Sequence, residues 1–161
     1  MTEAAPLHLH TETVRPEWID YNGHMNVAYY LLAFDHATDA VLDHFGIGKD
    51  YAETQSRSMF AVEAHLTYAR EVTEGDGLRF ASTVLAADAK RLHLFHTMHR
   101  AEEGFLAATA EFMLVHVDLA DRRTVPFSEE IRARLDATAQ AHAALPRPPQ
   151  AGRAIGLRRV P

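Results

Sequence analysis

The chain contains no cysteine among its 161 residues. This absence excludes disulfide bonds, thiolate metal sites and a cysteine nucleophile, so any nucleophile is an oxygen atom or an activated water. No run of about 18 apolar residues occurs, and no apolar segment lies between a basic start and a small-residue cleavage site. We therefore expect a cytoplasmic protein that does not span a membrane.

Positive charge is also scarce, because 16 lysines and arginines face 22 aspartates and glutamates, for a net charge of −6. A general nucleic-acid-binding protein normally has a basic face, so we expect no nucleic-acid partner. Basic residues gather only at the end of the chain, which holds four arginines and no acid from Pro146 onward. This basic tail, residues 146–161, either contacts phosphate groups or keeps a flexible end solvated.

The hydrophobic pattern divides the chain into one strand, one long helix and a run of further strands. With 47% hydrophobic content the chain can bury one core, and we assign residues 1–145 to a single domain. The pattern predicts strands at residues 7–15, 60–68, 78–88, 91–101 and 105–118, a long helix at 27–45, a loop at 46–58, and a helix at 128–145 capped by Ser128.

The long helix has one apolar face, and only the strands that follow it can cover this face. We therefore predict an α+β fold in which an antiparallel β-sheet wraps around one long central α-helix, with the second helix on the surface. One helix cannot cover a wide sheet, so an edge or face of the sheet should pair with a second copy of the chain. The predicted buried face comprises Val27, Tyr30, Leu31, Phe34, Thr38, Val41 and Phe45.

Three aspartates at four-residue spacing line another side of this helix: Asp35, Asp39 and Asp43. They form either a solvated face or a metal site, and their mutual repulsion favours the solvated face. The histidines of the strand at 91–101 do not form a three-ligand metal site, because the middle one points to the opposite face of the strand. The sequence therefore predicts no metal ion.

Between the first strand and the long helix lies the stretch WIDYNGHMN, residues 18–26. Asn22 and Gly23 are a favoured turn pair, Asp20 can make a side-chain turn, and Asn26 can cap the helix. The same polar groups are also placed for chemistry, because a helix start offers unpaired N–H groups and a positive dipole end. A carboxylate there can act as base or nucleophile toward a carbonyl that the N–H groups polarise. The spacing leaves both interpretations open.

A specific likeness rests on the polar residues of this stretch and two aromatic residues after them: Asp20, Asn22, Gly23, His24, Asn26, Tyr30 and Phe34. They resemble the motif of the hotdog-fold thioesterases of the 4-hydroxybenzoyl-CoA thioesterase superfamily. In the acyl-carrier-protein thioesterase branch the motif reads Asp-x-Asn-x-His-x-Asn, with an aromatic residue four positions later. The stretch LTYAREVTEGD, residues 66–76, is similar to the second family signature, and the likeness covers roughly residues 7–120.

The resemblance implies hydrolysis of an acyl-CoA thioester in a homodimer or homotetramer whose sites lie at subunit interfaces. Asp20 would be the general base or nucleophile, and Asn22 and His24 would orient water or substrate. The amides at the helix start would form the oxyanion site. No cofactor is implied, since coenzyme A is part of the substrate. The neighbouring residues would contact the substrate: Gly23, Met25, Asn26 and Val27.

Aromatic side chains surround the motif: Trp18, Tyr21, Tyr29 and Tyr30. They either pack in the core and in an interface or line a pocket that holds a quaternary ammonium group by cation–π attraction. The stretch WIDYNGHMNVAYYLLAFDHATD, residues 18–39, is similar to the thioesterase domains associated with carnitine dehydrogenases, which act on betainyl-CoA. A short acyl-CoA with a trimethylammonium group is therefore the substrate hypothesis.

Three charged residues far from the motif are further candidates. Glu63 is a second carboxylate if the polar side of its strand faces a partner's site, and otherwise it points to solvent. Lys90 and Arg91 are either ordinary surface charges or partners for the phosphates of CoA, together with the arginine tail.

Two alternative functions use the same fold. Hotdog enoyl-CoA hydratases and dehydratases typically carry Asp-x-Asn-Pro-x-His, whereas here the histidine follows the aspartate by four residues without a proline. A non-catalytic acyl-CoA-binding protein would leave Asp20 without a chemical role. The sequence therefore favours the thioesterase.

Overall fold

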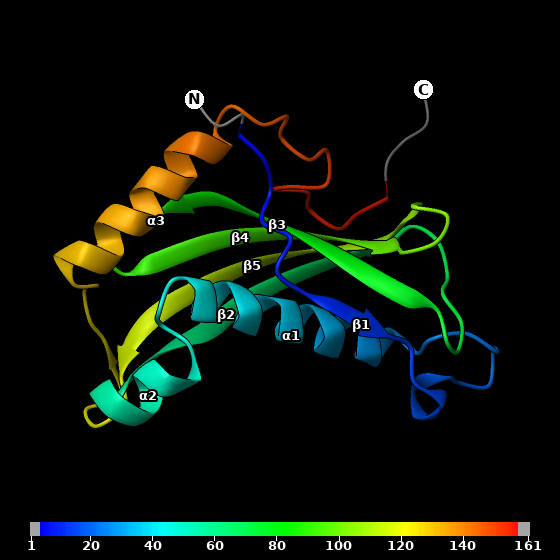
Figure 1. The fold of residues 1–161 in the computed structure, drawn as a ribbon, viewed down its shortest axis with the longest axis horizontal. Helices are drawn as coiled ribbons and strands as arrows, with labels where there is room; N and C mark the ends of the chain where they lie inside the picture. Colours follow the sequence, from blue (N-terminus) through cyan, green and yellow to red (C-terminus); the bar gives the residue numbers. More distant parts are fainter. Residues whose placement is uncertain (1–3, 158–161) are drawn as a thin grey trace.

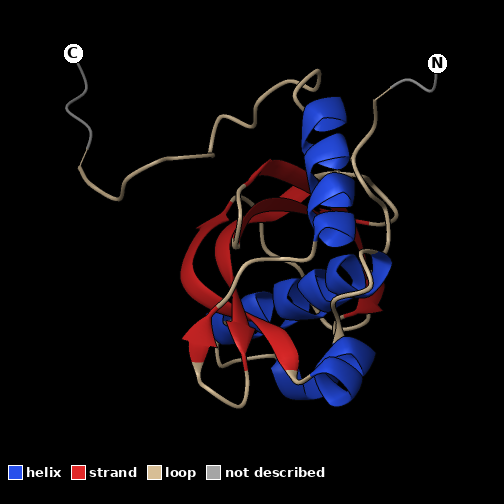
Figure 2. Cartoon of the chain, turned by 90° about the vertical axis from the view of Figure 1, so that its left-hand side faces the viewer, coloured by secondary structure: helices blue, strands red, loops and turns tan. Residues whose placement is uncertain are grey.

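The computed structural model describes residues 4–157 and consists of a curled antiparallel sheet with one long helix against its concave face (Figure 1). The strand order is β1-β3-β4-β5-β2, and β6 pairs with β5 outside this path. The elements are β1 (Thr11–Thr13), the 3-10 helix η1 (Pro16–Trp18), α1 (Val27–His44), α2 (Lys49–Gln55), β2 (Arg57–Tyr68), β3 (Gly77–Ala87), β4 (Arg91–Arg100), β5 (Leu106–Asp118), β6 (Arg123–Thr124) and α3 (Glu129–His142). The predicted α+β arrangement around a central helix is confirmed (Figure 2).

The long helix α1 begins after Asn26, whose side chain accepts a hydrogen bond from a backbone N–H of the first turn at 2.9 Å. It ends before Gly46, which has a φ of +73° that favours glycine. The predicted aspartate face is exposed to solvent. Partial burial, and then repulsion from Asp35 and Asp43, raises the pKa of Asp39.

The buried face of α1 is rotated from the predicted one. Val27 and Leu31 were expected inside, but their exposed fractions are 56% and 42%. The Tyr68 hydroxyl at the end of β2 donates to the Val27 carbonyl at 3.4 Å, so this side of α1 lies along the edge of the sheet. Small side chains on the opposite side allow a close approach to the sheet. The buried residues are Tyr30, Ala33, Phe34, Ala37, Thr38, Val41 and Leu42.

The four long strands agree with the predicted ranges to within a few residues at each end. β5 is flanked by β4 and β2, so it is a central strand, as its apolar sequence predicts, and β2 forms an edge of the sheet. The pairing of β2 with β5 contains a register shift between Ala61 and Glu63.

The second predicted helix, α3, packs on β3 and reaches the end of α1, where Arg134 donates to the carbonyls of His44 and Phe45. The Ser128 cap is confirmed by its acceptance of the Ile131 N–H at 3.3 Å. Within residues 4–157 no helix is both long and apolar enough to cross a lipid bilayer.

Two predictions about the chain's connections were wrong. The strand predicted at 7–15 is regular only at Thr11–Thr13. Leu7 also pairs with β3 through an isolated bridge, but the pairing is interrupted between Leu7 and Thr11. The loop predicted at 46–58 contains the helix α2. Its seven residues include good helix formers, and Lys49 and Glu53 form an ion pair at 3.6 Å one turn apart. η1 and β6 carry no periodic pattern and were not predicted.

The basic tail is partly placed by the structure. The Gly152 N–H donates to the Glu111 carboxylate on the outer face of the sheet, at 2.8 Å to one oxygen and 3.1 Å to the other. This segment therefore touches the domain rather than extending wholly into solvent. The last two arginines of the tail, Arg158 and Arg159, lie outside the described residues.

A histidine is buried between α1 and the sheet. His96 on β4 has no exposed surface, and its two ring nitrogens hydrogen-bond the Thr38 hydroxyl at 3.0 Å and the Ser82 hydroxyl at 2.8 Å. His93, on the opposite face of the same strand, contacts Glu111 at 2.7 Å, as the alternation predicts. Burial lowers the pKa of His96 from its ordinary 6.5 to about 3, so this side chain is neutral in the folded protein.

This burial predicts that the protein loses stability as the pH falls. His96 binds a proton near pH 6.5 when unfolded but only at about pH 3 when folded. Between these values the unfolded state binds more protons, so the free energy of unfolding falls with decreasing pH by up to about 1.4 kcal/mol per pH unit for this group. Urea unfolding from about pH 7 to about pH 4 should give a shallower pH dependence in His96→Gln than in the parent. Equal slopes in the two proteins would contradict a neutral buried His96.

Candidate active site

The loop before α1 is shaped by its own polar groups. The Gly23 N–H donates to the Asp20 carbonyl at 3.0 Å, and Gly23 has a φ of +81° that favours glycine. The Asn22 N–H donates to the Asp20 Oδ1 at 2.8 Å, and the Asp20 N–H donates to the His24 carbonyl at 3.1 Å. The predicted turn at Asn22 and Gly23 and the side-chain turn of Asp20 are both confirmed.

The same loop is anchored to the core on both sides. The Met25 N–H donates to the Val72 carbonyl at 2.9 Å, and the Asn26 N–H donates to the Trp18 carbonyl at 2.8 Å. Met25 is fully buried and packs behind the loop. Because these contacts fix the loop, the carboxylate of Asp20 is held beside the first turn of α1.

The start of α1 places a carboxylate close to backbone N–H groups. The Asn26 side-chain amide donates to the Asp20 Oδ2 at 3.4 Å while its oxygen accepts the Ala28 N–H. Within the described residues the Val27 N–H donates no hydrogen bond, so it is free to bind an oxygen atom of another molecule. Asp20 is partly exposed, and Asn22 and Gly23 are exposed. This arrangement can polarise a carbonyl and supply a base or nucleophile next to it.

A cavity of about 240 Å³ opens beside this helix start. It is lined by four of the predicted site residues: His24, Met25, Val27 and Tyr30. The other residues of the loop do not line it but lie next to it: Asp20, Asn22, Gly23 and Asn26. The end of β2 and the segment after it supply the remaining lining: Tyr68, Ala69, Arg70 and Glu71. None of these four was among the predicted site residues, although Tyr68 and Arg70 are the tyrosine and arginine of the second family signature.

The wall of this cavity is aromatic and carries charged side chains of both signs, Glu71 and Arg70. The rings of Tyr30 and Tyr68 meet edge to face with centroids 5.1 Å apart, and the Tyr30 hydroxyl accepts the Val72 N–H at 3.4 Å. Burial, more than the nearby charges of Glu71 and Asp20, raises the pKa of Tyr30, and burial also raises the pKa of Tyr68. Both phenols are therefore neutral at physiological pH.

Two charged side chains stand at the mouth of the cavity. The Glu71 carboxylate, which is 67% exposed, lies 3.8 Å from the His24 Nε2. The His24 Nδ1 lies 3.1 Å from the Met25 carbonyl, so both ring nitrogens of His24 face oxygen atoms. The Arg70 guanidinium lies over the ring of Phe105, 4.0 Å from its centroid.

Two aromatic residues expected in the pocket wall are elsewhere. Trp18 is only 2% exposed because it stacks on Tyr29 at 5.6 Å, with the guanidinium of Arg15 5.2 Å from the ring centroid. It is a core residue in this chain. Tyr21 is 97% exposed at the tip of the loop and lines no cavity within one chain. The aromatic contribution to the cavity comes from Tyr30, as predicted, and from Tyr68.

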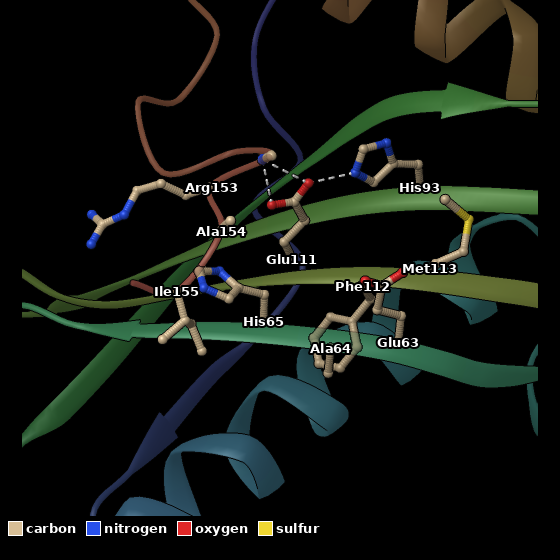
Figure 3. A pocket seen from close by; sticks show the side chains of 11 residues that line it. Glu63, Ala64, His65, His93, Glu111, Phe112, Met113, Arg153, Ala154 and Ile155 are labelled. Atoms are coloured by element: carbon tan, nitrogen blue, oxygen red, sulfur yellow. Dashed lines mark hydrogen bonds and ion pairs between the residues drawn. The ribbon is translucent and has the colours of Figure 1, made fainter. Parts of the chain in front are cut away.

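The second predicted carboxylate lies on the other face of the sheet. Glu63 lines a cavity of about 520 Å³ between the outer face and the C-terminal segment, together with His65, His93 and Glu111 (Figure 3). The sheet itself separates this cavity from Asp20. Within one chain the structure does not bring Glu63 to the motif.

The predicted phosphate partners are also remote within one chain. Lys90 precedes β4 and Arg91 begins it, whereas the other end of β4, at Arg100, is the end of the sheet near the motif. The length of β4 corresponds to roughly 30 Å at about 3.3 Å per residue. Arg91 is held by Asp88, with nitrogen–oxygen distances of 2.5 and 2.6 Å.

Comparison with known proteins agrees with the fold and the motif. The family model of the thioesterase-like superfamily matches residues 14–135. A betainyl-CoA thioesterase from Pseudomonas aeruginosa is 44% identical over 144 residues, which cover 89% of this chain and 91% of that protein. L-carnitine dehydrogenase/betainyl-CoA thioesterase from Rhizobium meliloti is 38% identical over 156 residues, which cover 97% of this chain but 31% of that longer protein.

Solved structures show the same architecture. A proposed thioesterase from Pseudomonas putida has a TM-score of 0.82 and 36% identity, covering 96% of this chain and 98% of that chain. A hypothetical protein from Staphylococcus aureus, solved in complex with CoA, has a TM-score of 0.87 and 29% identity, covering 98% of this chain and 100% of that chain. The chain therefore belongs to the thioesterase-like superfamily and is a thioester hydrolase with the hotdog fold.

Proposed function

We propose that this protein hydrolyses a short acyl-CoA, with betainyl-CoA as the foremost candidate, and that Asp20 carries out the reaction. The observation that supports this most is the position of the Asp20 carboxylate, held by Asn22 and Asn26 at the start of α1 beside a cavity. The relative from Pseudomonas aeruginosa supports the substrate, because it is a betainyl-CoA thioesterase similar over most of both chains.

The proposed reaction needs only the residues around the helix start. The free Val27 N–H and the helix dipole stabilise the negative charge that develops on the thioester oxygen. Asp20 either takes a proton from water as that water attacks the carbonyl carbon, or attacks it directly to form an anhydride that water then hydrolyses. In both routes the carbon–sulfur bond breaks, and CoA leaves as a thiolate that takes up a proton. Asn22 and His24 orient the water or the substrate.

Replacing Asp20 by asparagine should abolish most of the activity without disturbing the loop. The asparagine keeps an oxygen that accepts the Asn22 N–H, but it can neither take up the proton nor attack the carbonyl. We expect kcat/KM to fall by at least about 100-fold. Thiol release from a panel of acyl-CoAs measures the effect, and circular dichroism checks the fold of the variant.

The matched control is Asp35→Asn, which removes one exposed aspartate from the middle of α1 and should leave the rate near that of the parent. A folded Asp20→Asn variant that keeps the parent rate would rule out the assigned role. If the parent binds CoA esters but releases thiol from no member of the panel, the non-catalytic binding protein replaces the enzyme.

A cationic acyl group fits the wall of the cavity beside the motif. The neutral rings of Tyr30 and Tyr68 offer π-faces, and Glu71 adds a negative charge at the mouth. The guanidinium of Arg70, which also lines the cavity, lies over the ring of Phe105. A trimethylammonium group cannot donate a strong hydrogen bond, so aromatic surfaces and a nearby carboxylate are the groups that attract it. Of the four aromatic residues that the sequence offered for either the core or a pocket, only Tyr30 lines this cavity.

Glu71→Gln tests this cation subsite. For betainyl-CoA we expect kcat/KM to fall by about 1.4- to 5-fold, which corresponds to a loss of roughly 0.2–1 kcal/mol for an exposed ion pair. For 3,3-dimethylbutanoyl-CoA, in which a carbon replaces the charged nitrogen, the same substitution should have little effect. Parallel kinetics on both substrates with both proteins give the comparison. An equal loss for the two substrates would show that Glu71 does not recognise the charge.

We also propose that the working form is a dimer joined through β2. This strand is an edge of the sheet with twelve residues, and large apolar side chains are exposed on it and on the adjacent side of α1. The cavity of about 240 Å³ is smaller than the roughly 300–1,000 Å³ of typical ligand sites, so a partner would complete it. Antiparallel pairing of two β2 strands would bring the Lys90 end of the partner's sheet toward this pocket. The exposed residues are Val27, Leu31, Phe60, Val62 and Tyr68.

Val62→Glu should break the dimer. Val62 is 59% exposed in the middle of the edge strand, so a carboxylate there leaves the single chain folded but is repelled and desolvated in a paired interface. We expect light scattering after gel filtration to show a halved mass together with a large loss of activity. Gln55→Glu, which adds the same charge at an exposed position on α2, is the control and should remain dimeric. A parent protein that is monomeric and active would contradict the proposed assembly.

A further inference from the structure

We propose that His10, Glu12 and His36 form a binding site for one divalent transition-metal ion of the zinc class. The three side chains are remote from the cavity beside the motif. They come from two parts of the chain: His10 and Glu12 from the segment at and before β1, and His36 from the second half of α1. The sequence offers no signal for this site, because the third ligand is 24 residues from the second.

The donor atoms already converge. The His36 Nδ1 lies 2.9 and 3.0 Å from the two oxygens of Glu12, and the His10 Nε2 lies 3.0 Å from one of them. One nitrogen or oxygen atom from each side chain lies within 4.8 Å of those of the other two. Within residues 4–157 no other group of three histidine, aspartate or glutamate side chains brings its donor atoms within this distance of one another.

The spacing suits a small metal ion after a slight expansion. With metal–ligand bonds of about 2.0–2.1 Å, two ligands of a tetrahedral zinc ion are about 3.3 Å apart. The observed distances from Glu12 to the two imidazoles are a few tenths of an ångström shorter. Alternation along an extended segment places His10 and Glu12 on the same side, so small side-chain rotations are sufficient. Two imidazoles and a carboxylate are ligands typical of zinc, and solvent can supply the remaining position.

The charge balance of the cluster also favours a cation. The Glu12 side chain is only 9% exposed, and a buried carboxylate needs compensation. Its two nearest partners are imidazoles, which carry no charge when deprotonated. The Arg15 guanidinium is 3.9 Å away and 57% exposed, and it also lies over the ring of Trp18. A divalent ion between the three donors would neutralise Glu12 more directly than Arg15 does.

Such an ion would tie the first segment of the chain to the middle of α1. The segment continues from Glu12 through Arg15 to Trp18, whose carbonyl accepts the Asn26 N–H at the base of the active loop. The metal would therefore stabilise the connection between the loop and α1 without touching the substrate. We expect it to raise the unfolding temperature rather than to take part in hydrolysis.

Zinc titration of the metal-free parent, Glu12→Gln and His36→Ala tests the proposal, and His44→Ala is the matched control. His44 is an exposed histidine on the same helix, so its removal lowers the number of imidazoles while leaving the cluster intact. We expect the parent and His44→Ala to bind one equivalent of Zn²⁺ with equal affinity and to gain thermal stability. Each cluster variant should bind at least 10- to 100-fold more weakly, since even loss of a ligand's hydrogen-bond partner costs about this much.

Circular dichroism without metal establishes that the variants are folded, and Glu12→Gln keeps the shape and the hydrogen-bond acceptor of the original side chain. Similar zinc affinity in all four proteins would show scattered binding to surface histidines and would overturn the proposal. The absence of a one-to-one complex with the parent would overturn it as well, leaving the cluster as a set of hydrogen bonds that holds the segment to α1.

Discussion

The close packing of α1 against the curled sheet is the constraint on which the rest of the structure depends. Ala33 and Ala37 carry little volume, so the helix backbone lies near the strands and its larger neighbours fill the space on either side. This packing fixes where the helix begins. It also fixes the loop that carries Asp20, because the loop is bonded to the helix cap on one side and to the Val72 backbone on the other.

The catalytic arrangement that we propose is therefore an outcome of ordinary folding contacts. A side-chain turn, a helix cap and a buried methionine place the carboxylate and the free amide together. The same carboxylate serves the fold and the proposed reaction. One oxygen of Asp20 accepts a hydrogen bond in the turn, and this carboxylate is the group that we propose reacts. The two interpretations of the motif do not exclude each other.

Much of the fold could be predicted because its signals are local. The long strands and both long helices follow from hydrophobic period, and the caps at Asn26 and Ser128 follow from residue type. The site was predictable only in part. His24 and Tyr30 belong to the motif, so the sequence points to them directly. Tyr68 and Glu71 reach the cavity only because β2 ends beside the start of α1. The sequence left the core and the pocket both open for Trp18, because periodicity does not tell which of the two a large aromatic residue near a motif faces.

The register shift in β2 has a consequence for how this strand tolerates change. Before the shift Ala61 pairs with the buried Leu114, and after it Ala64 pairs with the buried Phe112, although both alanines are themselves exposed at this edge of the sheet. The extra residue, Val62, has no partner on β5, so Glu63 lies opposite Met113, as it would in a regular strand that lacked Val62. The strand could therefore lose Val62 and keep its other pairs with β5, whereas an insertion in this strand would need a second bulge or would exchange its two faces.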